Sequence, residues 1–127
     1  ERGSRFSIHT DPPPNGGQLI LCEGEFDALV AAEHEIVAVT TTCGKTLPAQ
    51  LARRFKGWNV AVTYDVGADR SAARTVDKLR DVGAREAWAV PLDLPHDGDD
   101  LTDWFVKYGR SADELSALIE RTREASK

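Results

Sequence analysis

The fold is decided by the stretch Leu19-Ile20-Leu21-Cys22-Glu23-Gly24-Glu25-Phe26-Asp27. Its first four residues form a short, continuous apolar run, which is typical of a strand that is covered on both faces. The residues that follow have helical spacing, so we expect a helix from Glu25 to Glu33 with Phe26, Leu29 and Val30 facing the core. A buried strand followed at once by a helix indicates an α/β fold.

The alternation of strand and helix continues along the rest of the chain. We expect further strands at 36–40, 58–64 and 86–90, and helices at 46–55, 69–82, 100–108 and from 111 onward. Such short links require right-handed crossovers, so the predicted fold is a mostly parallel four-stranded sheet with helices on both faces. In such sheets the chemistry lies outside the carboxyl ends of the strands.

Composition excludes several classes of protein. The 127 residues are 41% hydrophobic and 29% charged, which fits one globular domain and neither a disordered nor a membrane-embedded chain. The net charge of −5 argues against a protein that grips duplex DNA through its overall charge. It does not exclude a nucleic-acid enzyme, because a metal ion can offset local negative charge. With only two cysteines, a disulfide scaffold is not expected, and we expect a cytoplasmic protein.

The first residues differ in character from the rest. Residues 1–17 lack an initiating Met and contain three consecutive prolines, so we expect an irregular N-terminal segment or linker cut from a longer protein. Residues 18–127 form the expected domain. No apolar run approaches the length of about 20 residues that a bilayer crossing needs, so no membrane contact is expected.

Acidic residues follow the ends of the predicted strands. Glu23 comes directly after the first strand and Asp65 directly after the third. A dense acidic loop follows the fourth and contains Asp93, Asp97, Asp99, Asp100 and Asp103. Like charges held close together are unfavourable unless a cation neutralises them. Oxygen ligands suit Mg²⁺ or Mn²⁺, so the sequence predicts a divalent-metal site at this edge of the sheet.

Some of these acids also have a purely structural interpretation. Glu25 and Asp27 suit the first turn of a helix, where the helix dipole favours negative charge. Asp69 suits the cap of the long helix as well as it suits a ligand role, and either Asp99 or Asp100 suits the cap of the helix that follows them. The structural alternative is weaker for the two acids at strand ends.

Four stretches together resemble the Toprim family of primases, topoisomerases, nucleases and recombination-repair proteins. Residues 23–29 look like its Glu-Gly-x-x-Asp-Ala motif, and residues 42–47 (Thr-Cys-Gly-Lys-Thr-Leu) look like its Gly-Thr loop. Residues 64–73 stand where the family carries Asp-x-Asp-x-x-Gly. Residues 97–104 resemble the Gly-Lys-Asp-x-x-Asp stretch of primases and primase-helicases. The resemblance covers about residues 18–108, in the family's order, and implies a Toprim-like (Rossmann-like) fold.

The resemblance also implies a function. The domain is expected to be the Toprim part of a DNA primase or primase-helicase, a Mg²⁺- or Mn²⁺-dependent nucleotidyltransferase. Its implied catalytic residues are Glu23 and Asp65. Its implied metal ligands are Glu23, Asp65, Asp69, Asp99 and Asp100. Its implied nucleic-acid contacts are Lys45, Arg70 and Arg74, although a solvated loop lysine and an ordinary exposed helix face are the alternatives. The implied partners are single-stranded DNA, nucleotides and further domains such as a helicase.

One departure from the family pattern keeps other functions open. Counted without gaps from Asp65, the family's second aspartate falls on Gly67, and only a two-residue shift would bring Asp69 into that role. We prefer the ungapped register, so we expect one well-held ion rather than two. A Toprim nuclease is one alternative function. A degenerate Toprim domain that binds nucleic acid or a partner protein without chemistry is another.

Overall fold

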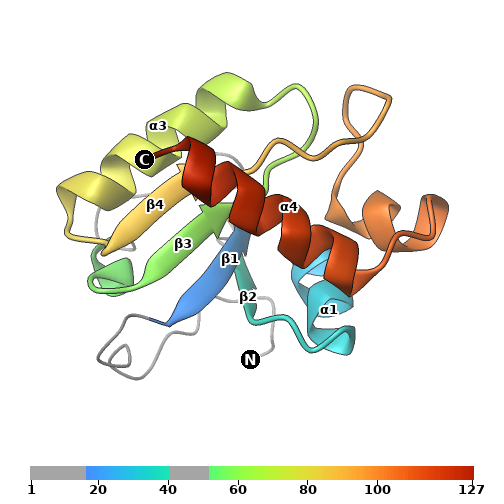
Figure 1. Ribbon diagram of the computed structural model, residues 1–127, viewed down its shortest axis with the longest axis horizontal. Helices are drawn as coiled ribbons and strands as arrows, with labels where there is room; N and C mark the ends of the chain where they lie inside the picture. The colour runs from blue at the N-terminus through green and yellow to red at the C-terminus, as the bar shows by residue number, and fades with distance from the viewer. Residues whose placement is uncertain (1–16, 41–51) are drawn as a thin grey trace.

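Four parallel strands form one sheet at the centre of the molecule (Figure 1). The structure is a computed structural model that describes residues 17–40 and 52–127. The strands are β1 (Gln18–Cys22), β2 (Ala38–Thr40), β3 (Asn59–Val62) and β4 (Glu86–Ala89), in the spatial order β2-β1-β3-β4. The predicted α/β fold with a four-stranded parallel sheet is confirmed.

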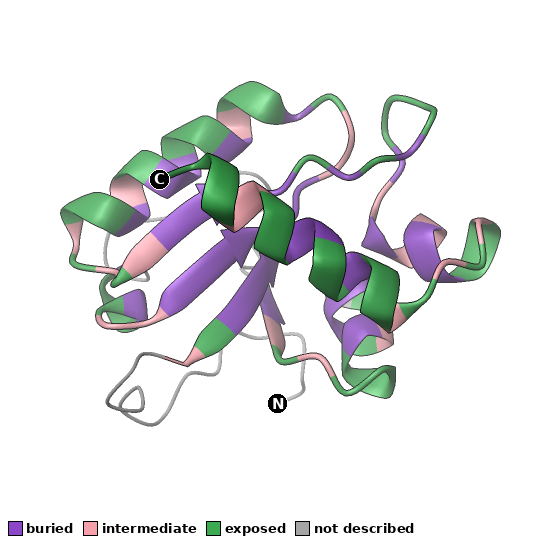
Figure 2. Ribbon diagram, in the orientation of Figure 1, coloured by how far each residue is buried: buried purple, intermediate pink, exposed green. Residues whose placement is uncertain are grey.

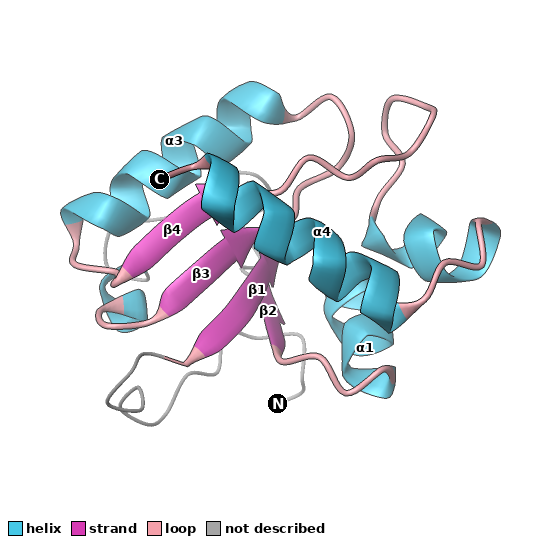
Figure 3. Cartoon of the chain, in the orientation of Figure 1, coloured by secondary structure: helices cyan, strands magenta, loops and turns pink. Residues whose placement is uncertain are grey.

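Helices cover both faces of this sheet (Figure 3). They are α1 (Glu25–Glu33), the 3₁₀ turn η1 (Arg53–Phe55), α3 (Asp69–Asp81), the π-helical turn η2 (Asp103–Lys107) and α4 (Ala112–Ala125). Residues of α1, η2 and α4 pack on one face, and residues of η1 and α3 pack on the other. Within the described ranges, no helix has both the length and the apolar character needed to cross a membrane.

The side chains of strand β1 contribute to two hydrophobic cores, one on each face of the sheet. Ile20 and Cys22 belong to the core beneath α1 and α4, whereas Leu19 and Leu21 belong to the core beneath α3. Successive side chains of a strand point to opposite faces, so a continuous apolar run satisfies both layers. The two central strands, β1 and β3, are accordingly buried almost throughout (Figure 2).

Helix α1 lies with a different face toward the sheet from the one that we predicted. Phe26 is 76% exposed and Leu29 is 49% exposed, so the prediction that both face the core is wrong. The buried residues of this helix are Asp27, Ala28 and Ala31. Because the side chains of Ala28 and Ala31 are small, the helix approaches the sheet closely, and Asp27 is buried with them.

The strand order reverses between β1 and β3. The chain runs from β1 outward to β2 on one side, and then returns to β3 and β4 on the other. In an open parallel sheet, the crevice outside the carboxyl ends of the strands at such a reversal is the usual ligand site. Glu23 immediately follows β1, and Asp65 follows β3 after Thr63 and Tyr64, so both lie beyond the ends of the two strands that flank this point.

Candidate metal centre

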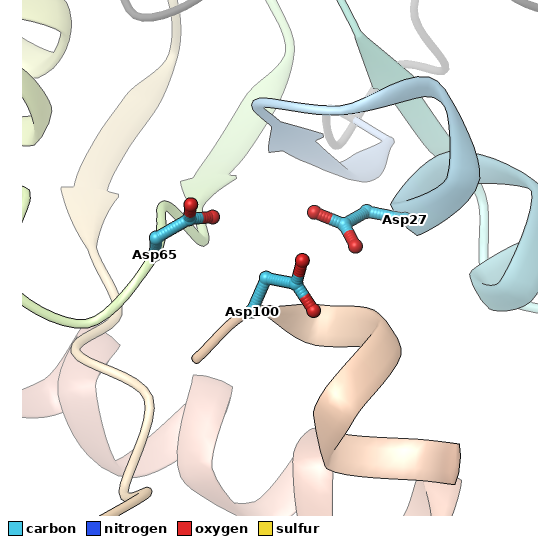
Figure 4. Close-up of side chains that lie close together, drawn as sticks. All are labelled: Asp27, Asp65 and Asp100. Carbon is cyan, nitrogen blue, oxygen red and sulfur yellow. The ribbon is translucent and has the colours of Figure 1, made fainter. Parts of the chain in front are cut away.

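Three carboxylates converge at the carboxyl edge of the sheet, beside the reversal in strand order (Figure 4). Asp27 lies in the first turn of α1, Asp65 follows β3, and Asp100 precedes η2. One carboxylate oxygen from each residue lies within 4.8 Å of an oxygen from each of the other two. The topology of the sheet therefore brings together three acids that are far apart in the sequence.

Glu23 supports this group through the main chain of Asp65. Its Oε1 accepts a hydrogen bond from the Asp65 backbone N–H at 2.8 Å. The Glu23 carbonyl in turn accepts a hydrogen bond from the Thr40 hydroxyl at 3.1 Å. Because β1 pairs with both β2 and β3, these bonds join the residues at the ends of three neighbouring strands. Glu23 is adjacent to the group of three carboxylates but is not one of its members.

The Asp27 carboxylate is buried and held in one orientation. The residue is 3% exposed, and its Oδ1 accepts hydrogen bonds from the Thr102 backbone N–H at 3.0 Å and from the Thr102 hydroxyl at 2.5 Å. Burial raises the pKa of Asp27, and the two bonds from Thr102 act in the opposite direction. Helix α1 is thereby tied to the segment that carries Asp100.

Asp100 both caps a helix and faces the group. Its Oδ1 accepts a hydrogen bond from the Asp103 N–H at 2.9 Å, and Asp103 Oδ2 accepts one from the Asp100 N–H at 3.0 Å. This reciprocal pair satisfies two backbone donors at the start of the helical residues 101–107. Burial raises the pKa of Asp100 to about 6, with a further contribution from the negative charge of Asp27. We expected one of Asp99 and Asp100 to cap this helix, and Asp100 does so.

Asp65 has the largest electrostatic perturbation in the group. Its pKa is raised to about 8, first by burial, then by the hydrogen bonding and negative charge of Glu23, and then by the charges of Asp27 and Asp100. Three carboxyl groups that resist ionisation together form a site that a divalent cation would stabilise. All the donor atoms are oxygens, which favours Mg²⁺ or Mn²⁺ over Zn²⁺.

The nearby Cys22 thiol does not add a sulfur ligand. It is 1% exposed and lies against the carbonyl oxygen of Val39, with an Sγ to oxygen distance of 3.6 Å. Burial and the negative charges of the carboxylates raise the pKa of Cys22, so the thiol stays protonated.

The structure directs Asp99 away from this group. Its Oδ2 accepts hydrogen bonds from the Tyr108 hydroxyl at 2.7 Å and from the His96 N–H at 3.1 Å, and the Lys107 Nζ lies 3.7 Å from its Oδ1. The bond from Tyr108 lowers the pKa of Asp99. Asp99 therefore braces the segment from His96 to Tyr108.

Asp69 and Gly67 also lie apart from the three carboxylates. Asp69 is exposed in the first turn of α3; it neither joins the group nor caps the helix, because the capping residue is Ala68. Gly67 has φ +95°, and a Cβ at this position would lie 3.4 Å from Asp97 Oδ1. An aspartate at position 67 would therefore be strained and would crowd another acid.

Two of the three predicted nucleic-acid contacts lie in the part of the chain that the structure describes. Arg70 and Arg74 are exposed on α3. Lys45 and the motif at 42–47 lie outside the described residues. Asp27 is not among the metal ligands predicted from the sequence, because the helix dipole alone accounts for an acid in the first turn of a helix. The signal that indicates its role is the spacing of Asp27 from Ala31, which places it on the small-residue face of α1.

Comparisons with known proteins support the fold. No protein-family model and no curated protein matches the sequence. The crystal structure of the Aquifex aeolicus primase, comprising its zinc-binding and RNA polymerase domains, is similar to this chain with a TM-score of 0.68 and 25% sequence identity. The similarity covers 84% of this chain and 26% of the primase chain, so this chain spans about a quarter of that structure.

Proposed function

We propose that this chain is a metal-dependent nucleotidyl- or phosphoryl-transfer module of the Toprim type, acting on nucleic acid as part of a primase or primase-helicase. The observation that carries the proposal is the convergence of Asp27, Asp65 and Asp100 where the strand order reverses. The similarity of the fold to part of a primase supports the choice of reaction.

The three carboxylates would hold one Mg²⁺ or Mn²⁺ ion. Such an ion, when bound, would stabilise the charge on phosphate oxygens during transfer. Mg²⁺ keeps several waters where few carboxylates reach it, which leaves positions open to a phosphate. Thr102 would orient the Asp27 carboxylate, and Glu23 would fix the main chain at Asp65. The Glu23 carboxylate also lies beside Asp65, so it is the proposed acceptor for a proton from an attacking hydroxyl.

The nucleic acid would be single-stranded DNA, with contacts from exposed basic side chains. Arg70 and Arg74 are four residues apart and so lie on one face of α3. The net charge of −5 means that such binding would be local and would need further domains of the protein. Lys45 and a nucleotide substrate belong to the same proposal.

A second candidate is a domain that binds without catalysis. The observation that favours it is Gly67, whose positive φ and closeness to Asp97 disfavour the second aspartate of the family pattern at this position. A single ion would then serve to organise the site rather than to run a two-metal reaction.

Metal binding is the direct test of the centre. Titration with Mn²⁺ should broaden the backbone amide signals of residues near Asp27, Asp65 and Asp100. The variant Asp65→Asn should weaken Mn²⁺ binding by about tenfold or more, because it removes one of few charged ligands. Asp77→Asn is the matched control, since Asp77 is exposed on α3 and is not one of the three carboxylates. Broadening centred elsewhere, or no broadening at millimolar Mn²⁺, would refute the metal centre.

Activity separates the two candidates. In the protein that contains this domain, Glu23→Gln and Asp65→Asn should each lower Mg²⁺-dependent primer synthesis by about 100-fold, and Asp77→Asn should leave it unchanged. Mg²⁺-dependent strand cleavage that is lost in the same variants would indicate a nuclease. Full activity in both variants would make this domain a binding platform.

A further inference from the structure

A cavity lies beside the metal centre, between α3 and the carboxyl ends of β3 and β4. Its volume is about 350 Å³, at the small end of the range of roughly 300–1,000 Å³ that is usual for ligand sites. Its walls are largely apolar and include Val62, Tyr64, Ala72, Ala89, Val90 and Leu92. A cavity of this size suits one small, flat group rather than a polymer.

Asp65 connects this cavity to the metal centre. The residue lines the cavity and is also one of the three converging carboxylates. A ligand that fills the cavity would therefore extend to the position of the ion. The cavity and the metal centre are thus two halves of one potential binding site.

The charges around the cavity decide which end of a ligand would enter it. The acids that line it are Asp65, Asp69 and Asp97, and among the residues that the structure describes no lysine or arginine lines it. These carboxylates would repel a phosphate but would accept hydrogen bonds from hydroxyl or amino groups. The part of the ligand inside the cavity is therefore uncharged, apolar on its faces and able to donate hydrogen bonds.

Main-chain hydrogen bonds hold the rim of the cavity in place. The Val66 N–H donates to the Asp99 carbonyl at 2.8 Å, and the Gly98 N–H donates to the Val66 carbonyl at 2.8 Å. These two bonds join the turn after β3 to the loop before η2. The absence of a side chain at Gly67 leaves space beside Asp97, since a Cβ there would contact the Asp97 carboxylate.

We infer that the cavity takes the nucleoside part of a nucleotide whose phosphates bind the metal ion at Asp27, Asp65 and Asp100. The inference rests on the proposed function, since it requires the ion. The base packs between the apolar walls, and the sugar hydroxyls donate hydrogen bonds to Asp69 and Asp97 at the rim. The cavity then orients the nucleoside, and the ion neutralises the charge of the phosphates. These two tasks fall to neighbouring parts of the carboxyl edge of the sheet.

The test compares two anions that differ only in the nucleoside. In the presence of Mn²⁺, the 127-residue chain should bind ATP about tenfold more tightly than inorganic tripolyphosphate. Ala89→Leu fills the cavity from a partly exposed position at the end of β4, and it should remove this difference while leaving tripolyphosphate binding unchanged. Ala73→Leu is the matched control, because it adds the same volume on the exposed face of α3.

A second variant keeps the test open if Ala89→Leu does not fold. Asp69 and Asp97 are both exposed, so the double variant Asp69→Ala/Asp97→Ala should fold. It should abolish the preference for ATP over 2′,3′-dideoxy-ATP that we expect in the wild-type protein. Equal binding of ATP and tripolyphosphate by the wild type, with Mn²⁺ still bound, would overturn the nucleoside site and leave the metal centre standing. Failure to bind Mn²⁺ at all would overturn both.

Discussion

Asp65 is the residue where protonation and metal binding compete most directly. Its carboxyl lies in two environments at once, one lined by the carboxylates of Asp27 and Asp100 and one lined by apolar side chains. Both environments disfavour its ionised form, and its pKa is about 8. A metal ion would have to displace a proton from this group near neutral pH, so metal affinity and protonation are linked.

The raised pKa of Asp65 predicts a specific dependence of stability on pH. The folded protein holds this proton more tightly than the unfolded chain does, so the stabilising contribution is complete below the ordinary pKa of 3.8 and is lost as the pH rises toward 8. Without metal, Asp65→Asn should therefore raise the free energy of unfolding at pH 8.5 and leave it nearly unchanged at pH 4. Partial exposure of the group limits the gain to about 1–2 kcal/mol.

Urea unfolding at the two pH values, in the presence of a chelator, measures this difference. Asp77→Asn serves again as the control, because Asp77 is exposed on α3 and is not one of the three carboxylates. An equal effect of Asp65→Asn at both pH values would mean that the Asp65 carboxyl is ionised normally in the fold.

At the scale of elements, the start of the helical residues 101–107 organises the site. It presents Asp100 as a cap, and two residues further along it presents the N–H and hydroxyl of Thr102 to Asp27. One short segment therefore supplies a carboxylate and also fixes the carboxylate of another helix. Groups that orient metal ligands in this way affect metal affinity almost as much as the ligands do.

Removal of the Thr102 hydroxyl tests this arrangement. Thr102→Val keeps the shape of the side chain and the backbone N–H, but it removes one of the two donors to Asp27. The pKa of Asp27 should rise and the affinity for Mn²⁺ should fall by about tenfold. Thr122→Val is the matched control, because its hydroxyl donates only within α4, to the carbonyls of Leu118 and Ile119. Equal affinities in the two variants, measured by calorimetric titration, would contradict the orienting role.

The elements also show how far the sequence alone reaches. The order of strands and helices follows from apolar runs and spacing, and α1 has the predicted bounds. Three strands are shorter than predicted: 36–40 is reduced to Ala38–Thr40, 58–64 to Asn59–Val62, and 86–90 to Glu86–Ala89. Apolar patterning marks burial rather than pairing, and Thr63 and Tyr64 remain buried beyond the end of β3.

The orientation of α1 lies beyond what the pattern can give. The apolar residues of α1 are distributed around all its sides, so their spacing does not select one face. In the structure the small residues Ala28 and Ala31 lie against the sheet instead of Phe26 and Leu29. For the same reason, the sequence pattern did not place Asp27 on the buried face of α1. Asp65 and Asp100 were predictable as members of the site, because acids after strand ends meet at one edge of a parallel sheet whatever the helices do.

At the scale of the whole molecule, the metal centre joins three parts of the chain that unfolding would separate. Asp27, Asp65 and Asp100 come from α1, the end of β3 and the segment before η2, which pack around a single sheet. An ion held by all three would bind the folded chain and not the unfolded one, so it should oppose global unfolding rather than local opening. At an ion concentration of 100 times the dissociation constant, the stabilisation would be about 2.7 kcal/mol.

The unfolding temperature therefore reports on the centre without any assay of activity. For a domain of this size, saturating Mn²⁺ should raise the unfolding temperature by about 8 °C, which is the increase expected for one bound ion per chain. Asp27→Asn should remove most of this increase, since it takes away the buried ligand that anchors α1, and Asp77→Asn should keep it. One ion rather than two is expected because Gly67 contributes no carboxylate and Asp97, its neighbour, is exposed. An unchanged unfolding temperature at millimolar Mn²⁺, or an equal increase in Asp27→Asn, would show that the three carboxylates do not hold an ion together.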